Sequence, residues 1–414
     1  MTVSRGRGRR ASLAAVLIPV MACASARETE PADDGLRFLT IVAADETACG
    51  IATDGKVHCW GANDVQLLGR GGISGSEDRR PTPIVGVGAA RSVTLNPVGE
   101  LACAVEASAG DLYCWGYTPF ASSDRPTKVA NLTGASAAAA GGSKSTIPFA
   151  CVVAEAGAVA CFGGDGAENV SDGTGSGQLG TGVEPQGQYR YPPQPILGGL
   201  SFRDVVAGDR HACGLVTSGA AYCWGANQVS QLGTVAPKEE CRTRTGSRFF
   251  ITWSCSGVPV PVAGSLTFRT LSAGLRVTCG LSTEGAGYCW GSDMGSVPTP
   301  VFPGTVLRAL AVSAAGRSCC VTTSGRVACV GRNDRGQGGD EDPGAGLHRL
   351  ASTLDFAAIA VADEFTCGLT TDGEGCGAGE ATAGASWLAP PTATSCKLST
   401  TPCSAVPLRV ETGS

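Results

Sequence analysis

The sequence has little charge, little histidine and no long apolar run in its body. Charged residues fill 16% of its 414 positions and only three histidines occur, so a dense catalytic or metal site is not expected. After residue 21, no stretch approaches the roughly eighteen apolar residues of a membrane-spanning helix. A chain with 60 glycines and 23 prolines is not a coiled coil, and its 43% of hydrophobic residues supply the core that disordered chains lack.

Cysteine, by contrast, is abundant. Twenty cysteines indicate an oxidising compartment, because cytosolic thiols are kept reduced. The N-terminus agrees with export: residues 1–10 hold four arginines and no acid, and residues 11–21 form an apolar stretch, which together are typical of a signal peptide.

Two cleavage sites compete in this leader. Residues 20–23 (VMAC) resemble a lipoprotein box, which makes residues 1–22 the signal peptide and Cys23 the lipidated N-terminus. Alternatively, the small residues 24–26 fit ordinary signal peptidase, with cleavage after residue 26. Residues 23–35 then form a polar tether. Loss of the four arginines takes the formal charge from −5 to −9, which disfavours binding to nucleic acid.

One phrase recurs seven times along the chain. Four copies pair a cysteine with a later Cys-Trp-Gly, at residues 49–61, 103–116, 213–225 and 279–291. Degenerate copies occupy residues 151–163, 319–331 and 367–377. An apolar strand precedes each copy, and a Pro-x-x-Val strand follows every copy except the sixth. Four short strands per repeat of about fifty residues are typical of a propeller blade.

These phrases, G-x-x-x-x-C-[GA]-[LI] and C-W-G-x-N followed by G-Q-L-G, resemble the regulator of chromosome condensation repeat family over residues 36–410. The chain looks like an exported, bacterial lipoprotein-like member. The resemblance implies an all-β fold, a seven-bladed β-propeller of four-stranded antiparallel blades over residues 36–414. It says little about function, because propellers host unrelated activities.

The cysteine spacing predicts disulfides within the blades. In five copies the cysteines are ten residues apart, with glycine six after the first. A three-residue hairpin loop ending in a left-handed glycine places such cysteines directly opposite, within disulfide reach. The second and seventh copies, spaced eleven and nine, fit four-residue loops. Zinc is disfavoured because no C-x-x-C pair occurs.

The expected pairs number nine: Cys49 with Cys59, Cys103 with Cys114, Cys151 with Cys161, Cys213 with Cys223, Cys241 with Cys255, Cys279 with Cys289, Cys319 with Cys329, Cys367 with Cys376, and Cys396 with Cys403. Cys320 is out of register with Cys329 and is the predicted free thiol.

No catalytic residue, metal ligand or cofactor is predicted. The histidines and the repeated tryptophans are interpreted as structural, namely His58, His211, His348, Trp60, Trp115, Trp224 and Trp290. The loop of residues 163–180 contains Asp165 and Asp172 but lacks the regular acid spacing of a calcium site.

The most distinctive element is an insertion at residues 236–257 of the fourth copy. It combines three arginines with three aromatic residues, the types enriched at interface hot spots: Arg242, Arg244, Arg248, Phe249, Phe250 and Trp253. The alternative is a small hairpin folded onto its own blade. Loops at residues 71–80 and 165–191 are expected to share its face.

The leading hypothesis is therefore an exported, envelope-anchored, monomeric interaction module at the outer membrane or cell surface, or secreted, that binds a protein or a surface glycan through these insertions. It contacts the membrane through a lipid anchor only. One alternative is a polysaccharide hydrolase or lyase with carboxylates in the central channel. Another is nucleotide exchange, as the family name implies, which export, disulfides and acidic charge disfavour.

Overall fold

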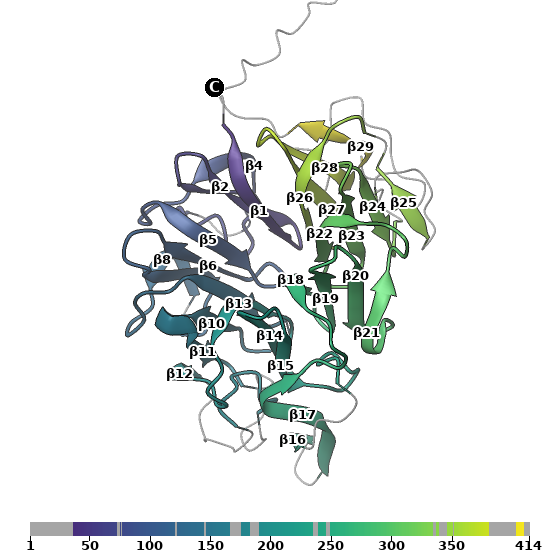
Figure 1. Ribbon diagram of the computed structural model, residues 1–414. Coiled ribbons are helices and arrows are strands. Elements are labelled where there is room, and N and C mark those ends of the chain that lie inside the picture. Colours follow the sequence, from purple (N-terminus) through teal and green to yellow (C-terminus); the bar gives the residue numbers. More distant parts are fainter. Residues whose placement is uncertain are drawn as a thin grey trace, which may run out of the picture.

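The computed structural model describes residues 36–380, except 73–74, 76, 121, 145, 166–174, 183–189, 235–238, 246–248, 334–336, 339–345 and 351, and also residues 403–409. Its fold is an all-β propeller, in which antiparallel sheets stand side by side around a central axis (Figure 1). Across the described residues there are seven sheets, six with four strands and one with five. The leader, the tether and Cys23 lie outside the described residues.

Each blade is built from strands that are consecutive in the sequence. The first three blades contain β1 (Phe38–Ala44), β2 (Thr47–Ala52), β3 (Val57–Ala62) and β4 (Glu77–Pro83); β5 (Ala90–Leu95), β6 (Leu101–Glu106), β7 (Leu112–Tyr117) and β8 (Ser122–Lys128); and β9 (Ala137–Gly141), β10 (Phe149–Val153), the 3-10 turn η1 (Glu155–Gly157), β11 (Val159–Gly163) and β12 (Tyr191–Pro195).

The fourth blade contains β13 (Phe202–Ala207), β14 (His211–Val216), β15 (Ala221–Ala226), β16 (Glu239–Thr245) and β17 (Phe249–Pro261). The last three contain β18 (Phe268–Ala273), β19 (Val277–Ser282), β20 (Gly287–Gly291) and β21 (Gly295–Val301); β22 (Leu307–Val312), β23 (Ser318–Thr322), β24 (Val327–Val330) and β25 (Leu347–Arg349); and β26 (Phe356–Val361), β27 (Phe365–Thr370), β28 (Gly375–Glu380) and β29 (Cys403–Arg409).

At six of the seven junctions, a glycine at the tip of the central hairpin links one blade to the next. This glycine has positive φ, for example +83° at Gly55, and its carbonyl accepts a hydrogen bond from the first strand of the following blade. Six junctions have this bond, at 2.8–3.0 Å: Gly55 O with Ala90 N, Gly110 O with Ala135 N, Gly219 O with Phe268 N, Gly285 O with Leu307 N, Gly325 O with Phe356 N, and Gly373 O with Phe38 N. The last of these closes the ring, and Phe38 packs with Phe365 in one buried cluster.

Indole side chains make a second link between blades. Trp115, Trp224 and Trp290 are fully buried, and each donates its Nε1–H to a backbone carbonyl of the preceding blade, at Leu67 (2.6 Å), Gln178 (3.0 Å) and Gln231 (3.0 Å) respectively. A buried indole N–H needs such a partner. The once-per-blade tryptophan therefore serves packing between blades, as the sequence analysis interpreted it.

Seven of the nine expected cysteine pairs are disulfides in the structure: Cys49–Cys59, Cys103–Cys114, Cys151–Cys161, Cys213–Cys223, Cys241–Cys255, Cys279–Cys289 and Cys319–Cys329. Cys320 is a buried free thiol, as expected because Cys319 and not Cys320 stands opposite Cys329. Burial raises the pKa of Cys320 to about 12. Cys396 lies outside the described residues, so its pairing with Cys403 stays a prediction.

Two expectations are wrong. Cys367 does not stand directly opposite Cys376: the register pairs Cys367 with Gly377, because this hairpin keeps the three-residue loop of the other blades, with Gly373 N bonded to Thr370 O. The fourth blade has five strands instead of four, because β16 pairs with the first half of β17 and adds a strand outside the repeat.

Phenylalanine and glycine compensate each other in volume within the blades. A Cβ at Gly280 would lie 2.5 Å from Cδ1 of Phe268, and the same crowding recurs at three further blades, between Phe38 and Gly50, Phe202 and Gly214, and Phe356 and Gly368. Where the phenylalanine is replaced, the glycine is too, as in the pairs Ala90 with Ala104, Ala135 with Val152, and Leu307 with Cys320. Cys320 therefore fills space that a phenylalanine ring occupies in other blades.

This compensation predicts a coupled effect of two substitutions. Gly280→Ala should lower the free energy of unfolding by about 1–3 kcal/mol through overpacking. In a Phe268→Leu background the same change should cost at least about 1 kcal/mol less, since the ring that collides with the new methyl is gone. Urea denaturation of the four proteins measures the coupling, and strictly additive losses would contradict the packing argument.

Candidate interaction face

The long insertions emerge at one end of the propeller. In an antiparallel blade, the connections from first to second and from third to fourth strand leave the sheet at the same end. We call this end the loop face. It carries the connections after β3, β11 and β15, which include the insertions at residues 71–80, 165–191 and 236–257. The sequence predicts that these three insertions share a face, and the strand order places them all on the loop face.

The insertion of the fourth blade is a two-stranded ribbon. Residues 249–255 of β17 pair with β16, whereas residues 255–261 pair with β15, so the ribbon of residues 239–255 extends beyond the repeat (Figure 1). The alternative interpretation, a small hairpin folded onto its own blade, is correct in that the insertion forms a hairpin, but this hairpin extends from the edge of the blade. It does not exclude binding, because the ribbon projects from the body of the ring.

The base of the ribbon is firmly anchored. The Cys241–Cys255 disulfide is fully buried. The amide of Asn227 donates to Ser254 O (2.8 Å), and the amide of Gly257 donates to the Glu239 carboxylate (2.6 Å). From the third blade, Gly182 N donates to Gly257 O (2.9 Å). A two-stranded ribbon is marginally stable alone, so these contacts hold it in place.

Five of the six residues singled out in this insertion lie in the two strands of the ribbon. Arg242 and Arg244 stand in β16, Phe249 and Phe250 begin β17, and Arg248 lies outside the described residues. Trp253, further along β17, is half-buried, and its Nε1 has no hydrogen-bond partner among the described residues. The ribbon thus brings the predicted residues together on one projecting element.

Asp165 ties down the neighbouring loop of the third blade. Its carboxylate accepts a hydrogen bond from Gly177 N (3.0 Å), a role that Asn227 performs in the fourth blade by accepting from Leu232 N (3.0 Å). Burial raises the pKa of Asp165 to about 7, although the amides of the loop act in the opposite direction. Asp165 therefore acts as a structural cap, and Asp172 lies outside the described residues.

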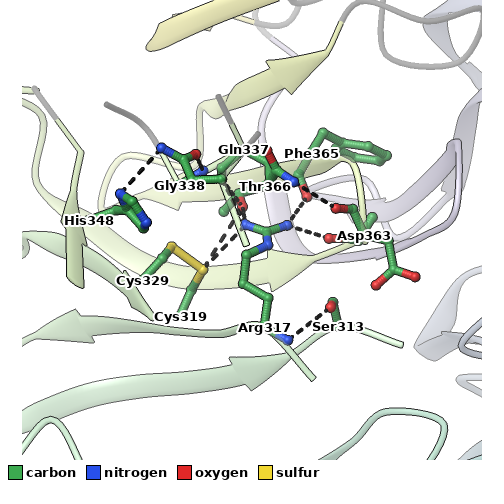
Figure 2. Close-up of a disulfide and its surroundings, with 12 residues drawn as sticks. Ser313, Arg317, Cys319, Cys329, Gln337, Gly338, His348, Asp363, Phe365 and Thr366 are labelled. Carbon is green, nitrogen blue, oxygen red and sulfur yellow. Dashed lines mark hydrogen bonds between the residues drawn. A yellow bond between two sulfur atoms is a disulfide. The ribbon is translucent and has the colours of Figure 1, made fainter. Parts of the chain in front are cut away.

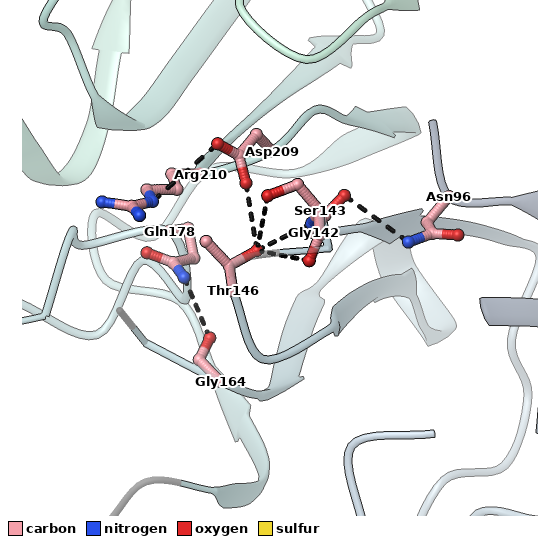
Figure 3. Close-up of polar contacts among 8 residues, drawn as sticks. All are labelled: Asn96, Gly142, Ser143, Thr146, Gly164, Gln178, Asp209 and Arg210. Atoms are coloured by element: carbon pink, nitrogen blue, oxygen red, sulfur yellow. Dashed lines mark hydrogen bonds and ion pairs between the residues drawn. The ribbon is translucent and has the colours of Figure 1, made fainter. Parts of the chain in front are cut away.

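Polar side chains connect the loop face across the third and fourth blades (Figure 3). Thr146 donates to the buried Asp209 carboxylate (3.0 Å), whose other oxygen lies 3.8 Å from Nε of Arg210. Gln178 is fully buried and donates to Gly164 O (3.1 Å). These contacts fix the relative positions of the loops from which the ribbon and the third-blade insertion extend.

His211 is structural. It is fully buried between the fourth and fifth blades, with Nε2 2.9 Å from Oγ1 of Thr278, which donates to Gln231 O (3.3 Å). Because Thr278 uses its hydroxyl proton in the bond to Gln231 O, its oxygen accepts from His211, so Nε2 carries the ring proton. Burial lowers the pKa of His211 to about 4. His58 packs edge-on to Phe38, as Tyr222 does to Phe202.

Arg317 is the residue that the sequence analysis missed (Figure 2). It is buried, and its guanidinium donates to Gln337 O (2.7 Å), Thr366 Oγ1 (2.6 Å) and Phe365 O (3.0 Å). Arg317 stands two residues before Cys319, as His211 does before Cys213. This shared position, two residues before the first cysteine of the repeat, is the sequence feature from which a structural role for Arg317 could have been inferred. Buried His348 contacts Asn333 (3.3 Å) beside this network.

The central channel is lined by the inner strands. A cavity of about 180 Å³ lies among β1, β5, β18, β22 and β26, with Thr94 and Ser272 as the polar side chains and no acid or histidine among its described lining residues. No group of three potential metal-ligating side chains occurs in the described part of the chain. The cavity therefore offers no carboxylate pair to the hydrolase alternative. None of the described helices could cross a membrane.

Comparisons with known proteins agree with this architecture. Residues 202–231 match the model of the regulator of chromosome condensation (RCC1) repeat. The solved structure of human WBSCR16 is similar with a TM-score of 0.63 at 16% identity, over 81% of this chain and 87% of that one. Prp20p of Saccharomyces cerevisiae (17% identity, 90% and 76% covered, TM-score 0.47) and the ectodomain of the Arabidopsis thaliana receptor kinase ACR4 (16%, 83% and 95%, 0.48) also match.

The fold and its loop face define a disulfide-bonded β-propeller, an architecture commonly used for interactions. Within it, residues 202–231 resemble an RCC1 repeat.

The raised pKa of Asp165 predicts a pH-dependent effect of Asp165→Asn. The pKa of Asp165 is about 7 in the folded protein and near 3.8 in the unfolded chain. The wild type therefore loses stability relative to the Asp165→Asn variant as pH rises from about 4 to about 7. The difference in unfolding free energy, variant minus wild type, should increase over this range by on the order of 3 kcal/mol. Denaturant unfolding at pH 4, 5.5 and 7.5 measures it. A difference that does not change with pH would refute the raised pKa.

The lowered pKa of His211 predicts the opposite trend. The unfolded chain binds a proton at His211 near pH 6.5 and the folded chain only near pH 4, so the wild type loses stability as pH falls through this window. His211→Gln should lack this loss, which amounts to roughly 3 kcal/mol between pH 7 and pH 4. Thermal or urea unfolding across that range compares the two slopes, and parallel profiles would contradict the assignment.

Proposed function

We propose that this protein is an exported, envelope-anchored interaction module that binds a protein or a surface glycan through the insertions of its loop face. The ribbon of residues 239–255 is the principal contact, and the third-blade insertion lies beside it. The protein acts as a monomer, is held at the membrane by a lipid on Cys23, and requires no cofactor or nucleic acid.

Export is supported by two independent features. The seven disulfides indicate an oxidising compartment outside the cytoplasm. The N-terminal sequence has the basic and apolar regions of a signal peptide, followed by the VMAC box. Lipidation of Cys23 belongs to the proposal, with a soluble secreted form as its alternative.

The observation that carries the binding role is the ribbon itself. It has no counterpart in the other blades described, it projects from the ring, and a buried disulfide and the third-blade loop hold its base. Its composition of arginine and aromatic residues is typical of interface hot spots. An element that is held by a disulfide, projects from the ring and, among the described residues, contacts another blade only at its base is best explained by a partner.

The proposal can be tested by comparing captured partners. Arg242, Arg244, Phe249 and Trp253 are replaced together by alanine, and the wild type and variant are used to capture proteins and glycans from envelope extract. We expect the variant to lose the principal partner, because truncation of hot-spot residues typically costs 2 kcal/mol or more, which is about thirtyfold in affinity.

A matched control replaces exposed residues at the opposite end of the blades. Leu39, Lys56 and Val306 are exposed there, and their triple replacement by alanine should leave capture unchanged. If the ribbon variant captures the same partners as the wild type, the ribbon is not the binding element.

A further inference from the structure

The outer strand of nearly every blade is blocked against further strand pairing. Proline lacks the N–H that a neighbouring strand would need, and proteins place it on exposed sheet edges for that reason. Five described outer strands contain proline, namely β4, β8, β12, β21 and β29, and β25 has only three residues. In the fourth blade, Pro259 and Pro261 block the part of β17 beyond the ribbon.

β16 is the exception among these edges. It has seven residues, Glu239–Thr245, without proline, and among the described strands it pairs with β17 alone. The other blades show that this fold routinely blocks its edges, so the open edge of β16 is not a general property of the repeat. A row of unpaired backbone groups on such an edge is a template for another strand.

The hydrogen bond at the base of the ribbon shows which backbone groups face outward. Ser254 O accepts from Asn227 N on the side of β17 away from β16. Since the N–H and C=O of one residue point to the same side of an antiparallel strand, Ser254 and its partner Glu240 form a non-hydrogen-bonded pair. By alternation, Glu240, Arg242 and Arg244 direct their backbone groups to the open edge.

The charge of the ribbon restricts the strand that can pair there. The ribbon of residues 239–255 includes three arginines and two acids, Glu239 and Glu240, on a chain whose formal charge is −5. Of the three outward-facing positions of β16, two hold arginine, Arg242 and Arg244, and the first holds Glu240. Like charges directly opposite each other destabilise a strand pair and opposite charges stabilise it. A strand with carboxylates opposite Arg242 and Arg244 is therefore favoured, whereas a second copy of β16 always places at least one arginine opposite an arginine when the strands pair about Arg242.

We propose that β16 binds an extended acidic segment of another protein, which adds to the fourth blade as an antiparallel sixth strand. This inference rests on the proposed function and specifies the partner: a protein segment with carboxylates at alternate positions. The backbone of β16 supplies the affinity, and the arginines select for acidic sequence.

The test uses the full mature protein and a capped peptide of four Val-Glu repeats, with a Val-Lys peptide as control. Arg242→Thr removes one charge but keeps the outward N–H, whereas Arg242→Pro removes the same charge and the N–H. In fluorescence anisotropy, we expect binding of the acidic peptide only, a several-fold weaker affinity for Arg242→Thr, and a further loss of at least tenfold for Arg242→Pro. Equal affinities of the two variants would overturn strand addition.

A second measurement does not depend on the variants folding correctly. N-methylation of alternate residues along the peptide edge that pairs with β16 should abolish binding to the wild type. Methylation along the opposite edge should leave the pairing edge intact. Binding that is insensitive to both would overturn the proposal, as would stronger binding of an acidic polysaccharide than of the peptide, or dimerisation of the wild type that Arg242→Pro prevents.

The two proposals fail separately. If the ribbon variant loses its envelope partner but no acidic peptide binds, the interaction role stands and strand addition is wrong. If the ribbon variant keeps all its partners, the interaction role of the ribbon is wrong, whatever the peptide does.

Discussion

The ring depends on one hydrogen bond repeated at six junctions, from the start of a blade to the carbonyl of a hairpin glycine in the blade before it. The glycine must adopt positive φ, which a side chain would strain, and its carbonyl then points out of its own blade. The same bond joins Gly373 to Phe38, so the ring closes without exchange of strands between its ends. The chain therefore closes the ring with the interaction that links most of its blades.

Local features were the ones that could be predicted from the sequence. The spacing of Cys49 and Cys59 around a loop ending in Gly55 determines which residues stand opposite each other, so six disulfides of the repeat and the free Cys320 could be predicted by counting residues. The same counting was wrong at Cys367, because it assumed that the loop would change to keep the cysteines opposed. The structure keeps the Thr-Asp-Gly loop and shifts the cysteine instead. Turn geometry thus outweighs cysteine pairing in setting the register.

Contacts between blades could not be predicted in this way. Arg317 and His211 both reach a threonine of the next blade, Thr366 and Thr278, and these threonines donate to Gln337 O and Gln231 O. The two side chains share a position but no chemical type, and only the three-dimensional register shows that they do the same work. The fifth strand of the fourth blade was missed for a related reason, since its pairing depends on where β17 leaves β15.

The insertion also shows how a repeat protein acquires a distinct surface without weakening the ring. Its strands continue the outer side of one blade, away from the glycine carbonyls and indoles that join neighbouring blades. The repeat's own prolines remain on β17 at Pro259 and Pro261, so the new strand is added beyond a blocked edge and does not replace it. A disulfide between Cys241 and Cys255 then holds the two strands together where the ribbon leaves the blade. Variation confined to this element changes what the edge can bind while the seven sheets keep their packing.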